Sequence, residues 1–319
     1  DMASEPNSER KKNAIKHTAY PIEDSGGFIW VYLGPEEEIT PFQPPAWAPF
    51  PGVKASIVKI HTHCNWAQVL EGSIDSAHSS SLHSSNMPAA EVENSTATAD
   101  SWLRPSNDKS PKLEIEMTDY GFQYAALRKP IKNEEENYYI RTTIFIAPFT
   151  VLIPPNTEYK LAQMLFPIDD YNTMFYWVAW HPDPSKGISQ EDWRRFCAAE
   201  VGTDLDENYI RKLNLGNWFK QDREAMKKGH FTGIKGIPAE DMAMWESMGR
   251  IANRSHEILG SSDLSIVKFR HQMLKAANDF AAGEPAIGTK RTNTRHVDLS
   301  SFEGIVPKST DWRALRDTY

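Results

Sequence analysis

Asp75, His78 and His83 lie within nine consecutive positions and have the types and spacing of a metal site. Imidazole nitrogens bind divalent first-row metals, and a nearby carboxylate can accept the second N–H of a metal-bound imidazole and fix its orientation. Asp75 precedes His78 by three positions, which is about one helical turn. The stretch therefore predicts two metal-binding imidazoles and one supporting carboxylate.

The element that carries these residues is predicted as a helix over residues 64–83. Its apolar residues recur near helical spacing: Trp66, Val69, Leu70 and Ile74. On a regular helix His78 and His83 would be separated by about 140° of rotation and would not share a face. The three serines at 79–81 form helix poorly and compete for backbone hydrogen bonds. We therefore expect the helix to loosen there and bring His83 round to His78.

A third ligand has to come from elsewhere in the chain. Two histidines and one carboxylate with open positions are typical of non-haem Fe(II) oxygenases. The carboxylates of residues 236–249 are candidates: Asp241, just inside a helix start marked by Pro238, and its neighbours Glu240 and Glu246. Asp241 is favoured, because a fixed backbone can aim it. Spacing alone does not separate iron from zinc, and a pair of exposed histidines on a serine-rich helix end remains the alternative.

The composition excludes several classes of protein. The chain has 319 residues, 40% of them hydrophobic, which allows a sizeable core. Its net charge of −8 argues against nucleic acid as a main partner, because phosphate binding needs a basic surface. No apolar run approaches the roughly 20 residues of a membrane span, and there is no signal-peptide pattern. Two cysteines cannot form a disulfide framework, so a cytoplasmic location is expected.

Strand patterns dominate the middle of the chain and helical patterns follow them. Turn signals separate the strand-like segments, which predicts an antiparallel meander. These segments are residues 113–118, 120–127, 138–146, 150–155 and 174–180. Helical patterns occupy residues 189–200, the residues after Pro238, and residues 263–282. This grouping predicts an α+β fold in which helices pack on one antiparallel sheet.

The remaining segments are predicted to be connections. An apolar run at residues 28–33, between Gly-Gly and Gly-Pro, predicts a strand pair with a turn before it. The proline-rich residues 41–51 stiffen the chain, so we place a domain boundary near residue 48. Residues 84–101, rich in Ser, Ala, Thr and Asn, predict a long loop, and the last thirty residues are expected to be mostly irregular.

Three segments resemble a known family. Residues 65–83, NWAQVLEGSIDSAHSSSLH, resemble the Asn-Trp…Glu-Gly-x-x-Asp-x-x-His-x-x-x-x-His signature of the Rieske non-haem iron aromatic-ring-hydroxylating oxygenases. Residues 233–271 resemble the phthalate dioxygenase branch of that family. Residues 18–35, TAYPIEDSGGFIWVYLGP, resemble the end of its Rieske domain.

The resemblance implies a domain arrangement and roles for the metal-site residues. Residues 49–319 would form a helix-grip-like catalytic domain, and residues 1–48 would be the C-terminal part of an all-β Rieske [2Fe-2S] domain. His78, His83 and Asp241 would bind a mononuclear Fe(II). Implied partners are O2, a flavin/iron–sulfur reductase, and other subunits in a homotrimer or stacked hexamer.

The resemblance also implies a path for electrons. Asp75 would connect the iron to a Rieske-cluster histidine of a neighbouring subunit. The family binds its cluster through Cys-x-His and Cys-x-x-His, and neither Cys64 nor Cys197 lies in such a motif. We expect the cluster ligands in an N-terminal part of the Rieske domain that this sequence does not include.

The branch implies phthalate as substrate, with cis-dihydroxylation at its 4,5 positions by O2. Two adjacent carboxylates suit guanidinium groups, which bind them in plane with two hydrogen bonds. Arg141 interrupts an apolar strand and Arg104 follows the predicted loop; together with Ser76 they match carboxylate-contacting positions of the branch. Arg128 and Arg270 are rivals for which a structural role is expected.

Three other interpretations stay open. A relative in the same branch would act on another aromatic carboxylate, by dioxygenation of a phenoxybenzoate or by O-demethylation. A binder of hydrophobic ligands without a redox role would also use a sheet covered by a helix. A zinc hydrolase fits less well, because the sequence has no His-Glu-x-x-His motif.

Overall fold

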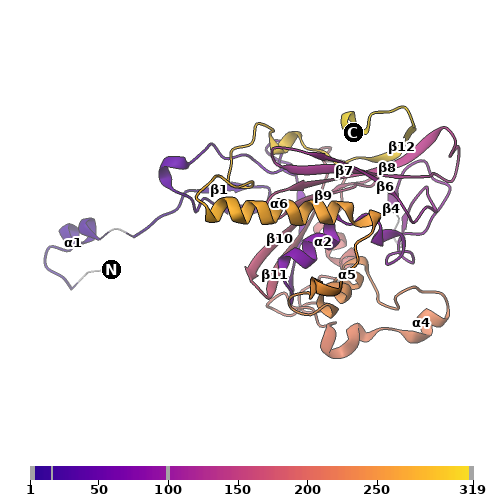
Figure 1. Cartoon of the computed structure of the whole chain (residues 1–319). Coiled ribbons are helices and arrows are strands. Elements are labelled where there is room, and N and C mark those ends of the chain that lie inside the picture. Colours follow the sequence, from indigo (N-terminus) through magenta and orange to yellow (C-terminus); the bar gives the residue numbers. More distant parts are fainter. Residues whose placement is uncertain (1–3, 16, 98–100, 316–319) are drawn as a thin grey trace.

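An eight-stranded antiparallel sheet forms the centre of the protein (Figure 1). The structure, a computed structural model, describes residues 4–15, 17–97 and 101–315. The strands run in the order β3-β11-β10-β9-β8-β7-β6, and β12 pairs with the remaining edge of β8. Their bounds are Ala55–Thr62 (β3), Lys112–Met117 (β6), Gly121–Arg128 (β7), Asn137–Ile146 (β8), Thr150–Ile153 (β9), Lys160–Asp169 (β10), Asn172–Trp180 (β11) and Glu303–Pro307 (β12).

The two faces of the sheet bury different sets of side chains. Because neighbouring residues of a strand point to opposite faces, Phe175 and Trp177 of β11 lie in the larger apolar core, on the helix side. Val178 and Trp180 lie on the other face, in a second core with Trp47. Both faces are therefore covered, which explains why β7 and β8 are buried along almost their whole length.

Helices cover the face of the larger core. They are α2 (Trp66–Ile74), α3 (Gln190–Phe196), α5 (Ile237–Ser247) and the long α6 (Leu264–Ala281), which lies across the sheet in Figure 1. The helices α2 and α5 approach closely at Gly72, where an added Cβ would lie 2.1 Å from the indole nitrogen of Trp245. Only glycine allows this approach, and it brings the two helices of the site together. The short helix α4 (Arg223–Lys227) projects from the body.

The N-terminal segment packs its aromatic residues against the second face. A hairpin of β1 (Ile22–Ser25) and β2 (Phe28–Val31) confirms the predicted strand pair. The Trp47 indole donates a hydrogen bond to the Gly26 carbonyl and contacts the ring of Trp180. Helix α1 (Ser8–Ala14) stands away from the body (Figure 1). The boundary near residue 48 stays a prediction, and residues on both sides of it share this core.

Several predicted elements need correction. The helix predicted over residues 64–83 ends at Ile74. Strand β10 was not predicted, and β12 forms a strand in the tail that was expected to be irregular. The loop predicted at 84–101 contains a short pair, β4 (Thr96–Ala97) with β5 (Trp102–Leu103); residues 98–100 lie outside the described residues.

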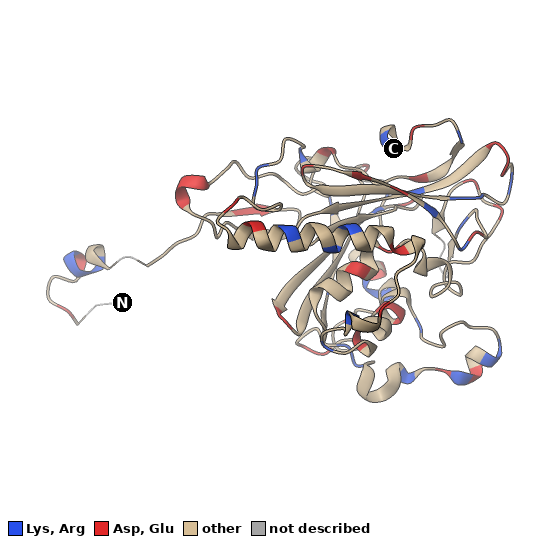
Figure 2. Cartoon of the chain, viewed as in Figure 1, with Lys and Arg blue, Asp and Glu red and all other residues tan. Residues whose placement is uncertain are grey.

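Charged residues of both signs are distributed over strands, helices and loops, in line with the acidic net charge (Figure 2). None of the helices in the described ranges has the length and apolar character needed to span a bilayer.

Candidate metal centre and adjoining cavity

Helix α2 begins and ends at side-chain caps that direct the next residues into the site. The Asn65 side chain accepts the Ala67 N–H and starts the helix. At the other end Asp75 is extended, with φ −81° and ψ 118°, and its carboxylate accepts the N–H groups of Ala77 (2.7 Å) and His78 (3.2 Å). A carboxylate that binds its own following backbone competes with helical hydrogen bonds. This explains why the helix stops before the serines.

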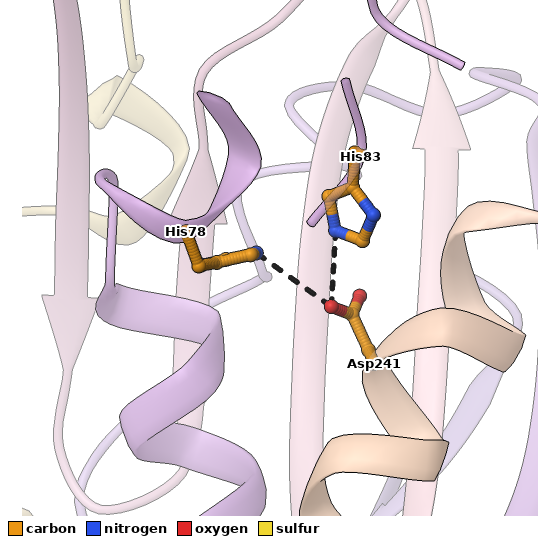
Figure 3. A group of neighbouring side chains, drawn as sticks. All are labelled: His78, His83 and Asp241. Carbon is orange, nitrogen blue, oxygen red and sulfur yellow. Dashed lines mark ion pairs between the residues drawn. The ribbon is translucent and has the colours of Figure 1, made fainter. Parts of the chain in front are cut away.

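His78, His83 and Asp241 converge, as the sequence predicts (Figure 3). The Oδ1 atom of Asp241 lies 3.0 Å from His83 Nε2 and 3.6 Å from His78 Nε2. The three donor atoms lie within 4.8 Å of one another. Donors bound to one ion at roughly 2.1 Å lie up to about 4.2 Å apart, so the 3.0 Å and 3.6 Å separations from Asp241 fit a shared ion. The chemistry of the donor set therefore fits a metal with open positions.

A second carboxylate lies behind each imidazole. His78 Nδ1 is 3.3 Å from Asp75 Oδ2, and His83 Nδ1 is 2.7 Å from Glu240 Oε2. Each Nδ1 therefore faces an acceptor while each Nε2 faces Asp241. Carboxylates in this position fix the tautomer and the ring orientation of a metal-binding histidine. Asp75 takes the predicted supporting place, whereas Glu240 supports His83 instead of competing with Asp241.

The electrostatics of the site favour a cation. Burial lowers the pKa of His83, but Asp241 and Glu240 outweigh it and raise that pKa to about 9. Burial raises the pKa of Asp75, but His78 and the Ala77 N–H outweigh it, so the net pKa is lowered. The two carboxylates therefore favour positive charge at His83, and a metal cation would compete with a proton for this place.

We expect Glu240→Gln to weaken ferrous iron binding by about 10- to 100-fold, the usual loss when a supporting carboxylate is removed. Glu240 is fully buried and also accepts hydrogen bonds from Asn86 and Thr232, so its carboxylate is fixed. The measurement is competition for iron between the metal-depleted enzyme and a chelator. Glu246→Gln, on the same helix, is the matched control; equal iron affinities in both variants would contradict the assignment.

A cavity adjoins the three metal-site residues and has a polar floor. Ser76, Asp75 and Asp241 line it from the helix side, and Arg141 and Gln163 line it from the sheet. Its remaining wall is mainly apolar and includes Met87, Trp102, Ile153, Pro154, Trp177, Ile237 and Trp245.

Several polar atoms of the cavity lining lack a partner among the described side chains. They are Arg141 Nε, Gln163 Oε1 and Trp177 Nε1. The guanidinium of Arg141 has no hydrogen bond or ion pair within the described part of the chain, although the residue is buried. Buried polar groups are normally hydrogen-bonded, so these atoms indicate a polar ligand. Arg141 is on the same face of β8 as Thr143, which also lines the cavity.

The other predicted arginines lie further from the cavity. Arg104 is buried and donates hydrogen bonds to the Met87 carbonyl and to the hydroxyls of Ser79 and Ser80. Of these residues Ser79 and Met87 line the cavity, whereas Arg104 itself does not. Its contact with substrate therefore stays a prediction.

Two further arginines were weighed as rivals. Arg128 is buried on β7 and binds Ser76. Arg270 forms ion pairs with Glu71 and Glu257, which is the structural role expected for it.

Sequence reasoning missed Gln163 and the roles of Glu240 and Arg128. Gln163 lies on β10, which was not predicted as a strand. The pattern Ala-Glu-Asp at 239–241 offered a signal for Glu240, because two consecutive helical carboxylates can reach the two sides of one imidazole. Nothing in the sequence separates Arg128 from other arginines at strand ends.

Comparison with known proteins identifies relatives over nearly the whole chain. The family described as LigXa C-terminal domain like matches residues 31–319. The chain is 52% identical to the phthalate 4,5-dioxygenase oxygenase subunit of Pseudomonas putida, over 100% of this chain and 72% of that protein. It is 29% identical to the 3-chlorobenzoate-3,4-dioxygenase oxygenase subunit of Comamonas testosteroni, over 98% of this chain and 73% of that protein.

Solved structures show the same fold at low identity. Dicamba monooxygenase bound to 3,6-dichlorosalicylic acid aligns with a TM-score of 0.51 and 12% identity, over 82% of this chain and 71% of that one. This likeness confirms the predicted α+β fold, an antiparallel sheet covered by helices.

Proposed function

This chain belongs to the Rieske non-haem iron oxygenases, in the family described as LigXa C-terminal domain like, and we propose on that premise that it is the oxygenase component of a phthalate 4,5-dioxygenase. The observation that carries the proposal is the cavity between His78, His83 and Asp241 on one side and the unpaired guanidinium of Arg141 on the other. An aromatic acid placed there would have its carboxylate on Arg141 and its ring beside the metal.

The charges around the cavity support a dicarboxylate. Arg104, Arg128 and Arg141 are all buried, and the described residues offer none of them a carboxylate partner. Burial first, and then the neighbouring Arg141, lower the pKa of Arg104 and of Arg128 to about 10. Buried like charges of this kind are unfavourable until an anion offsets them. Phthalate, with two adjacent carboxylates, would supply that compensation.

In the proposed reaction the protein binds, orients and excludes water. His78, His83 and Asp241 would hold ferrous iron, which would supply the activation of O2. With two electrons from the reductase and two protons, the ring and O2 would give the cis-4,5-dihydrodiol. Arg141 and Ser76, which line the cavity, would hold the carboxylates and turn the opposite edge of the ring toward the metal, and Arg104 would add its positive charge from behind Ser79 and Met87. This is catalysis by positioning, and the apolar wall of the cavity keeps water out.

We assign the remaining parts of the system from the family. Residues 1–48 would complete a Rieske domain whose [2Fe-2S] cluster is fed by a flavin/iron–sulfur reductase. The subunits would form a homotrimer or a stacked hexamer, in which each iron receives electrons from the cluster of a neighbour. Asp75 would connect the two centres, because its carboxylate lies 3.3 Å from Nδ1 of His78.

We expect Asp75→Asn to lower kcat about 10- to 100-fold while iron content and phthalate affinity stay within a fewfold of wild type. The amide keeps an oxygen that can accept the Ala77 N–H but carries no charge toward His78. The measurement is the rate of product formation with the reductase, beside iron content and phthalate titration. A loss of iron in parallel with kcat would show that Asp75 only holds His78.

The experiment that tests the proposed function uses the full-length, iron-loaded enzyme with a reductase, phthalate and ¹⁸O₂. The expected product is the cis-4,5-dihydrodiol with both labelled atoms on one ring face. Arg104→Ala and Arg141→Ala, tested separately, should reduce the preference for phthalate over benzoate. If both variants keep the wild-type preference, the dicarboxylate assignment is wrong.

A second candidate keeps the oxygenase chemistry and changes the acid. The 3-chlorobenzoate-3,4-dioxygenase oxygenase subunit and the 24% identical 5,5'-dehydrodivanillate O-demethylase oxygenase subunit are named for other aromatic acids. Phenoxybenzoate dioxygenation or O-demethylation are therefore the alternatives. A higher kcat/KM for a monocarboxylate or a methyl ether than for phthalate would favour them.

A further inference from the structure

The side chain of Arg128 acts on a single residue of the cavity lining. Its Nη2 donates to the Ser76 carbonyl at 2.6 Å and to the Ser76 hydroxyl at 3.2 Å, and its Nη1 donates to the same hydroxyl at 3.3 Å. Arg128 is 2% exposed and does not line the cavity, so its charge acts on the cavity through Ser76.

These contacts determine what the Ser76 hydroxyl can do. A guanidinium has donors only, so the hydroxyl oxygen must accept from Arg128 and its own proton must point elsewhere. The described residues give that proton no acceptor. Ser76 lines the cavity beside His78 and opposite Arg141. The free proton is therefore available to an acceptor in the cavity.

We propose that Arg128 is a positioning residue that holds the Ser76 hydroxyl as a hydrogen-bond donor to a carboxylate oxygen of the bound acid. This inference rests on the proposed function, since it takes an aromatic acid as the ligand. Ser76 and Arg128 would then determine specificity together. The fixed hydroxyl donor favours an ionised carboxylate, which accepts its hydrogen bond, over a donor group such as an amide NH2 in the same place.

A second side chain on the same strand, that of Tyr124, offers a comparison. Tyr124 lies four residues before Arg128 on β7, on the same face, and its hydroxyl donates to the Ile74 carbonyl at 2.6 Å. The Ser265 hydroxyl also donates to that carbonyl, at 3.3 Å. Tyr124 therefore supports the same chain segment without touching Ser76. If the role of Arg128 is purely structural, substitutions of Arg128 and of Tyr124 should have similar effects on phthalate binding.

The test is a double-mutant cycle on the full-length, iron-loaded enzyme without O2, read as the phthalate dissociation constant by calorimetry. Ser76→Ala and Arg128→Met are each expected to weaken phthalate binding about 10-fold, the value of one charge-assisted hydrogen bond. Both changes remove the same hydrogen bond to phthalate. The dissociation constant of the double variant should therefore be no more than about 2-fold above that of the weaker-binding single variant. Tyr124→Phe should bind within about 3-fold of wild type.

The second readout is the preference for phthalate over its monoamide, phthalamate. Wild type should prefer phthalate, and both Ser76→Ala and Arg128→Met should lose most of that preference. Additive losses in the double variant, or an equal loss in Tyr124→Phe, would overturn the proposal. If Arg128→Met does not fold, Arg128→Lys replaces it in the same cycle, since lysine keeps the charge but not the fork.

The wild-type titration separates this inference from the proposed function. If wild type binds benzoate or phenoxybenzoate but not phthalate, the proposed substrate is wrong, and the same cycle on the acid that binds decides the role of Arg128. If wild type binds none of these acids, both proposals fail.

Discussion

Replacing Asp241 by alanine is expected to remove the mononuclear iron from the full-length enzyme and to lower phthalate turnover by at least about 100-fold. Asp241 supplies the carboxylate of the three donor atoms that lie within 4.8 Å of one another. Without it, two imidazoles remain, and a pair of neutral ligands does not balance the charge of a divalent ion. The measurement is the total iron per subunit minus the iron of the [2Fe-2S] cluster. The amount of cluster is determined from acid-labile sulfide.

The control for this prediction is Met244→Ala, on the same helix. Met244 is 44% exposed and is neither a metal donor nor a residue of the cavity lining, so its variant should keep iron and turnover. Circular dichroism of both variants separates a lost ligand from a lost fold. An Asp241→Ala protein with full mononuclear iron would exclude Asp241 as a ligand.

Replacing Arg141 by methionine is expected to raise the dissociation constant of phthalate at least about 100-fold. A guanidinium fork on a carboxylate makes two charge-assisted hydrogen bonds of about 1.5–3 kcal/mol each, and about 1.4 kcal/mol corresponds to a factor of ten. Methionine keeps the length and the apolar stem of the side chain, so the cavity should keep its shape. The measurement is phthalate titration of the iron-loaded enzyme without O2.

The same substitution should not lower the melting temperature, and this distinguishes it from a structural loss. In the protein without ligand, the Arg141 guanidinium is buried and unpaired, which costs stability; removing it relieves that cost. Arg270→Met is the matched control, because it removes the ion pairs that Arg270 forms with Glu71 and Glu257. It should lower the melting temperature and leave phthalate affinity unchanged, and the reverse pattern would refute the assignment of Arg141.

Much of the candidate metal site was predictable from the sequence because three of its residues are close together in the chain. Asp75, His78 and His83 lie in one short segment, and a proline marks the helix start that aims Asp241. The predicted helix was too long because Asp75, read as a helical residue, binds the backbone N–H groups that follow it. The contact between Asp75 and His78 was nevertheless predicted correctly, because only three positions separate the two residues.

The missed parts depend on contacts between distant segments. Strand β10 is buried on both faces from Leu161 to Leu165, so its apolar residues do not alternate with polar ones and the period does not identify a strand. Strand β12 contains Gly304 and Pro307 and forms only because one edge of β8 is free for pairing. The contact of Glu240 with His83 joins residues 157 positions apart, so the sequence shows Glu240 as a neighbour of Asp241 but does not place it behind His83.

The two walls of the cavity have different functions. The segment from Ser76 to His83 and helix α5 supply the metal donors, while strands β8 and β9 supply Thr143 and Ile153. A protein engineer can therefore alter the acid that fits by resizing side chains on the strands, without disturbing the turn that fixes the imidazoles. Libraries confined to those strand positions should yield variants with new aromatic substrates that still load iron, whereas libraries in the serine-rich turn should mostly yield inactive protein.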